Sequence, residues 1–65
     1  MDDVKMILFR ECKQAHDYYL QFAAIDGKAG KVLAEDHRNR YYALYDVIVL
    51  AHLESAYRDF CKSNQ

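Results

Sequence analysis

Cys12 and His16 have the residue types and the spacing of half a metal site. Both are zinc ligands, and residues four positions apart on a helix lie on the same face. A closed zinc site needs four ligands, however, and no second pair accompanies these two. Cys12 also falls in the middle of an apolar stripe, where a free thiol behaves as a small hydrophobic side chain. The sequence therefore predicts a buried structural cysteine, with no bound metal and no other cofactor.

His37, next to Asp36, comes closest to an acid–base pair. Neighbouring residues on a helix point about 100° apart, so these two side chains do not converge on one atom of a substrate. His37 falls on the stripe expected to face the core, near Tyr41, which favours a boundary histidine bonded to a tyrosine or a carbonyl. No set of residues supplies a nucleophile, a base and a stabilising group together, so the sequence predicts a protein that is not an enzyme.

One stretch has the composition of a nucleic-acid contact. Residues 37–42, HRNRYY, combine two arginines with two tyrosines, and two lysines precede them near the expected turn. Arginine holds phosphates and exposed aromatic rings stack on bases. The competing interpretation, which we favour, is a solvated helix face on which Arg38 pairs with Glu35 and Arg40 pairs with Asp36. The alternative function, a nucleic-acid-binding modulator, would use Lys28, Lys31, Arg38 and Arg40.

Composition and charge define the broad class of protein. Hydrophobic side chains make up 52% of the 65 residues, which is enough for a packed structure and too much for intrinsic disorder. Nine basic and ten acidic side chains give a net charge of −1, so no general field attracts the chain to nucleic acid or anionic lipid. No apolar run approaches the roughly 20 residues of a membrane span. The amino-terminal residues lack a secretory signal pattern, so a cytoplasmic protein with reduced thiols is expected.

The sequence contains one stretch with strong turn-forming residues, at positions 26–30. Proline is absent, and the two glycines, Gly27 and Gly30, both lie in this stretch. Gly27 is expected to adopt the left-handed conformation that ends a helix, and Gly30 to open the next helix. The sequence therefore predicts two helices with one turn between them.

Apolar residues recur in steps of three and four on both sides of this turn, which is the spacing of a helical face. The pattern predicts a first helix at about residues 3–25 and a second at about 31–62. A short turn between them implies an antiparallel hairpin. The expected fold class is all-α, with residues 1–65 forming a single helical-hairpin domain.

The two expected helices differ in length, at about 35 Å and about 48 Å. The second would outrun the first from near Glu54 onward, which would leave large aromatic side chains in water. A second copy related by a two-fold axis would cover them, giving a homodimeric four-helix bundle. The alternative is a break near Ser55 that turns the last residues into a short third helix, although no glycine or proline supports it. The expected dimer interface comprises Leu50, Leu53, Tyr57 and Phe60.

Small size also favours a partner. A domain of roughly 60 residues is marginally stable alone and usually needs a disulfide, a metal or a second chain. An antiparallel hairpin places Cys12 and Cys61 far apart, so no disulfide is expected. Association with a second copy is the remaining source of stability.

The length, the single glycine-marked turn and the two expected helices resemble the small helical-hairpin accessory proteins of plasmids and temperate phages, such as the plasmid copy-number modulator Rop. The resemblance is architectural, and no RNA-contacting residue is carried over. Residues 35–40, EDHRNR, are also similar to a helical segment of the Hha family of nucleoid-associated modulators. Together these resemblances imply a bacterial, plasmid or phage regulator that works by binding. The expected function is therefore a non-enzymatic homodimer that modulates a host process through contact with an unknown protein partner.

Overall fold

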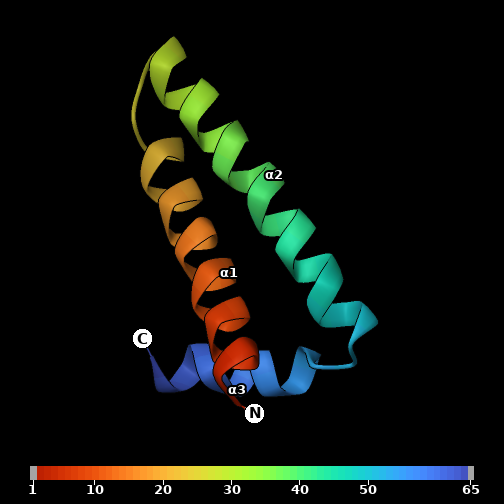
Figure 1. Cartoon of the computed structure of the whole chain (residues 1–65). Helices are drawn as coiled ribbons and strands as arrows, with labels where there is room; N and C mark the ends of the chain where they lie inside the picture. Colours follow the sequence, from red (N-terminus) through yellow and green to blue (C-terminus); the bar gives the residue numbers. More distant parts are fainter. Residues whose placement is uncertain (1, 65) are drawn as a thin grey trace.

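The computed structural model describes residues 2–64, and the elements in this range are three helices and no strand. Helix α1 spans Asp2–Ala23, α2 spans Lys28–Leu50 and α3 spans Glu54–Ser63. Helices α1 and α2 lie side by side and antiparallel, and α3 crosses their open end, where both termini also lie (Figure 1). The expected all-α fold class is confirmed.

The turn between α1 and α2 depends on both glycines. Gly27 has a φ of 107°, a conformation that residues with a side chain rarely adopt. Gly30 is buried in the first turn of α2, and a Cβ atom there would lie 2.5 Å from the carbonyl oxygen of Ile25. Gly27 thus provides the positive φ before α2, and Gly30 allows the turn to pack closely against the new helix.

The predicted second helix at residues 31–62 is wrong in its extent, because α2 ends at Leu50. The backbone N–H of Leu53 donates to the carbonyl oxygen of Ile48 at 2.9 Å, and that of His52 donates to Val49 at 3.0 Å. This pair of bonds is the Schellman motif, which satisfies the last free carbonyls of a helix. The residue at its left-handed position is usually glycine, but here it is His52, with a φ of 59°.

Helix α3 begins directly after this cap. Leu53 precedes it and accepts a hydrogen bond from the backbone N–H of Tyr57 at 2.9 Å. Glu54 lies in its first turn and Lys62 in its last, so both charges complement the helix dipole. Residues 2–64 therefore form three helices, as in the alternative with a short third helix, and the break lies at residues 51–53, close to Ser55.

The core lies where α3 crosses the hairpin. Its buried members are Phe9, Cys12, Ile48 and Tyr57, each at most 7% exposed. The ring of Phe9 on α1 lies 5.4 Å from that of Tyr57 and 5.6 Å from that of Phe60. The aromatic side chains expected to overhang the hairpin are thus covered by the chain's own first helix. No helix within residues 2–64 has the length and apolar character needed to cross a membrane.

Candidate functional site

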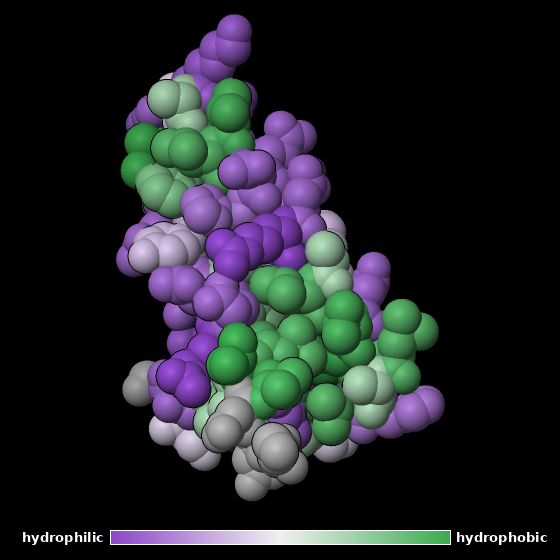
Figure 2. All heavy atoms as spheres, viewed as in Figure 1, coloured by the Kyte–Doolittle hydropathy of each residue, from purple (hydrophilic) through white to green (hydrophobic). Residues whose placement is uncertain are grey.

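The most distinctive surface is an exposed hydrophobic face at the open end of the hairpin, which we call the open face. It combines the start of α1 with the end of α2, and Figure 2 shows hydrophobic side chains gathered over this region. Each of these helices contributes two residues to the open face, and the two lie three positions apart and therefore on one side of their helix. The open face consists of Val4, Ile7, Val47 and Leu50, with exposed fractions of 72%, 54%, 49% and 80%.

An ion pair between the two helices lies next to the open face. Arg40 of α2 contacts Glu11 of α1 through its guanidinium group. Glu11 lies one turn after Ile7, and Arg40 lies two turns before Val47, so the pair continues the same side of both helices. The open face is therefore bordered by a pair of opposite charges toward the middle of the hairpin.

A second hydrophobic area lies toward the α1–α2 turn (Figure 2). Ile25, Val32 and Leu33 belong to this end of the hairpin and are between 43% and 57% exposed. Polar surface separates this area from the open face. The protein thus has hydrophobic surface at both ends of the hairpin, with charged residues between them.

The structure separates the residues expected at the dimer interface. Leu50 is 80% exposed and belongs to the open face. Tyr57 is buried, and Leu53 and Phe60 pack against the core of the same chain. The overhang from which this interface was inferred does not exist, because α3 folds back at residues 51–53. Of the four, Leu50 alone has most of its surface free for a partner.

The four basic residues proposed for nucleic-acid contact do not form one patch. Lys31 and Arg38 line a shallow hollow together with Glu35, whereas Arg40 lies on the opposite side of α2 at its ion pair with Glu11. Lys28 is exposed at the start of α2. The expected Arg38–Glu35 pair is present at 3.5 Å, but Arg40 pairs with Glu11 rather than with Asp36. Both arginines thus have carboxylate partners, and nucleic-acid binding stays a prediction.

The histidines of the α1–α2 interface pack against aromatic rings. The His37 ring stacks on Phe22 with 5.3 Å between centroids and 12° between planes, and it also lies 5.2 Å from Tyr18. The His16 ring lies 4.8 Å from that of Tyr41. His37 is half-buried at the helix boundary, as expected, although its nearest rings belong to α1.

A cluster of two cysteines and one tyrosine lies between α1 and α3, and it was not predicted from the sequence. Cys12 is fully buried, as expected, and Cys61 packs against the same core. The expectation that the two cysteines lie far apart is wrong, because α3 returns Cys61 to the side of α1. Burial raises the pKa of the Cys12 thiol. Burial also raises the pKa of the Tyr57 hydroxyl, and its contacts with the thiols of Cys12 and Cys61 raise it further.

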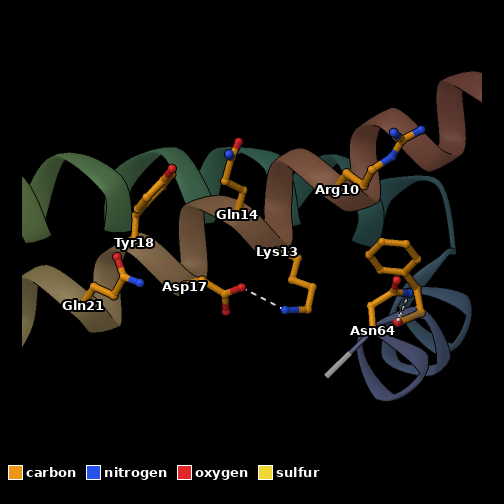
Figure 3. A pocket seen from close by; sticks show the side chains of 8 residues that line it. Arg10, Lys13, Gln14, Asp17, Tyr18, Gln21 and Asn64 are labelled. Carbon is orange, nitrogen blue, oxygen red and sulfur yellow. Dashed lines mark hydrogen bonds and ion pairs between the residues drawn. The ribbon is translucent and has the colours of Figure 1, made fainter.

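A shallow groove lies between the outer side of α1 and the end of α3 (Figure 3). Lys13 and Asp17 point toward each other along it and form an ion pair of 2.8 Å. At its far end the side-chain amide of Asn64 donates to the carbonyl oxygen of Phe60 at 2.8 Å. These polar groups are partnered with one another, and they include no nucleophile with an adjacent base.

Within residues 2–64 no group of three or more histidine, cysteine or acidic side chains is placed to hold a metal ion. Comparison with known proteins gave no significant match to a protein family, a curated protein or a solved structure. The physical character of the surface is therefore the basis for a functional proposal.

Proposed function

We propose that the chain is a non-enzymatic interaction module that forms a homodimer through the open face. The observation that carries this proposal is the exposure of four large aliphatic side chains at one end of the hairpin, namely Val4, Ile7, Val47 and Leu50. Contiguous exposed apolar surface of this kind marks protein contact sites. The proposed dimer interface thus keeps Leu50 from the expected interface, and Val4, Ile7 and Val47 take the place of Leu53, Tyr57 and Phe60.

The charges beside the open face favour a second copy as the occupant. In a two-fold contact the same surface patch of both copies forms the interface, so the patch must be complementary to itself. The neighbouring Glu11 and Arg40 have opposite charges, so an antiparallel arrangement can place each near its counterpart on the other copy. Pairs of this kind contribute mainly to orientation and specificity. The same surface is therefore complementary to itself in both its apolar and its charged part.

The expected affinity follows from the exposed area. Full burial of a large apolar side chain contributes about 1.5–3 kcal/mol, so covering the exposed parts of these four contributes roughly 4–8 kcal/mol per protomer. Association costs about 4–15 kcal/mol in lost translational and rotational freedom. The two protomers together gain roughly 8–16 kcal/mol, so a Kd of roughly 1–100 μM, a net of about 5.5–8.2 kcal/mol, is expected where the cost lies in the lower part of its range.

Sedimentation equilibrium of the full chain across this concentration range tests the proposal. The mass should rise from that of a monomer to that of a dimer. Val47→Glu should shift the Kd upward by at least about 30-fold, because it places a charge at a buried apolar contact. The matched control is Val49→Glu, since Val49 is 39% exposed but points about 200° away around the same helix.

The control variant should retain the dimer, and circular dichroism should show that both variants keep their helices. A monomeric mass at every concentration would refute the dimer. Equal weakening by Val47→Glu and Val49→Glu would refute the open face as its site.

A further inference from the structure

Two cysteines from different helices meet at the core, next to one tyrosine. Cys12 lies in the middle of α1 and Cys61 near the end of α3, 49 positions later in the sequence. Both thiols lie beside the hydroxyl of Tyr57, and both side chains belong to the packed core. They are present as free thiols. The fold therefore brings together two thiols that the sequence separates widely.

The two thiols differ in access to solvent. Cys12 has no exposed surface, whereas Cys61 is half-buried at the edge of the core. A small molecule in solution can therefore reach Cys61 and cannot reach Cys12 in the folded chain. Burial also lowers the thiolate fraction of Cys12, because it raises the pKa of this thiol, so Cys12 reacts only in the second step, against a sulfur already held beside it. Since the thiolate is the attacking species, Cys61 is the thiol that reacts first.

A covalent bond between Cys12 and Cys61 sets a geometric requirement on the position of α3. A disulfide requires Cα atoms about 4.4–6.8 Å apart and a defined torsion angle. Helix α3 is only ten residues long and joins α2 through residues 51–53. Its position depends on this connection and on the aromatic contacts of Tyr57 and Phe60 with Phe9, so these are the contacts against which α3 would adjust when the bond closes.

We propose that Cys12 and Cys61 are a redox-active pair that a small-molecule disulfide of the glutathione type converts into an intramolecular disulfide joining α1 to α3. The Cys61 thiolate attacks one sulfur of the small disulfide, whose S–S bond breaks and releases one thiolate. The Cys12 thiolate then attacks the sulfur of Cys61, and the second small thiolate leaves. Two protein thiols are oxidised, one small disulfide is reduced to two thiols, and the protons pass through solvent to the products.

This bond would act on α3 alone. In the reduced chain α3 is attached by the connection at residues 51–53 and by its aromatic contacts with α1. In the oxidised chain it is also tied covalently to the middle of α1. Disulfides in reducing compartments are mostly transient and redox-sensing, which agrees with a half-buried pair rather than a sealed one. The inference is independent of the proposed dimer, because the open face contains neither cysteine.

The test uses the full chain, fully reduced and then equilibrated with glutathione buffers of increasing oxidised fraction. Acid-quenched samples are measured by intact mass spectrometry. The expected product is a monomeric species about 2 Da lighter, with no glutathione attached, because two hydrogens are lost. Its Tm at fixed protein concentration should exceed that of the reduced chain by on the order of 10 °C, since the bond closes a long loop.

Two variants test the order of the steps. In Cys12→Ala, Cys61 should accumulate as the mixed disulfide with glutathione, because no second thiol releases it. In Cys61→Ser, the buried Cys12 should remain unmodified. Circular dichroism checks that each variant is folded. The mass measurement on the wild-type chain does not depend on either variant. Accumulation of wild-type mixed disulfide, a disulfide-linked dimer, or no reaction over the whole redox range would overturn the proposal.

Discussion

Replacing His52 with glycine should stabilise the protein, although it removes a larger side chain. His52 has a φ of 59° in the cap that ends α2, and its side chain is exposed. A residue with a Cβ atom is strained in the left-handed region by roughly 1–2 kcal/mol, and histidine tolerates it better than most. Glycine removes this strain but has more backbone entropy to lose on folding, by about 0.5–1 kcal/mol. The net expectation is a gain of about 0.5–1 kcal/mol in the free energy of unfolding.

Thermal and urea unfolding, followed by circular dichroism at one fixed protein concentration, measure this gain. A change of 1 kcal/mol moves the Tm of a domain this small by about 4–8 °C, so a rise of about 2–8 °C is expected for His52→Gly. The matched control is Ala43→Gly, at an exposed position within α2, which should lower stability by about 1 kcal/mol.

The two glycine substitutions should therefore act in opposite directions. His52→Val should lower stability, because a β-branched residue is strongly disfavoured at positive φ. If His52→Gly destabilised the chain as much as Ala43→Gly does, residues 51–53 would not be the helix terminator described above, and a continuous second helix would again be the better account.

Three other predictions concern the turn, the core and the thiols. Gly30→Ala should cost about 1–3 kcal/mol in the free energy of unfolding, because its Cβ would meet the Ile25 carbonyl oxygen at 2.5 Å; urea unfolding measures this. Phe9→Ala should cost about 3–5 kcal/mol, and proteolysis should then cut α3 first, since Phe9 holds both of its aromatic rings. Stability should fall as pH rises above about 9, because the unfolded chain releases the protons of Cys12 and Tyr57 from ordinary values of 9.0 and 10.0 while the folded chain retains them. The slope is limited to about 1.4 kcal/mol per pH unit for each group and should be smaller in Cys12→Ala, as urea unfolding at pH 8 and 10.5 would show.

The sequence predicted the hairpin because its signals are local. Glycine occurs twice, and both residues are needed where the chain reverses, for a positive φ at Gly27 and for close packing at Gly30. The apolar stripe of α1 also placed Cys12 correctly in the core, where it has no exposed surface. Periodicity and glycine placement were sufficient for these features because neighbouring residues determine them.

The third helix could not be predicted from the sequence as clearly as the hairpin, because the local sequence signal for the break before it is weak. The terminator of α2 has a histidine where glycine is usual, and both of its hydrogen bonds involve backbone atoms that no residue type reveals. The feature that favours the break is tertiary. Tyr57 and Phe60 gain the cover of Phe9 only when α3 folds back, and this gain outweighs the strain at His52.

The predictions for the dimer interface and for the two cysteines both depended on whether the second helix breaks before residue 54. With a continuous second helix, Tyr57 and Phe60 were assigned to a partner, and Cys61 was placed far from Cys12. Once α3 returns to α1, the same residues form a core and a thiol pair, and Leu50 remains exposed in the open face. The open face was not found from the sequence, because Val4 falls on the apolar stripe of α1 that also contains the buried Cys12.

The short connection at residues 51–53 also makes α3 a ligand tethered to its own receptor. A segment joined by so few residues sees its binding site at an effective concentration on the order of millimolar, whatever the concentration of the protein. Weak contacts with Phe9 are then enough to keep α3 bound. Contact between two copies has no such tether and follows the total concentration. Dilution should therefore separate the two events, leaving a monomer in which α3 is still docked.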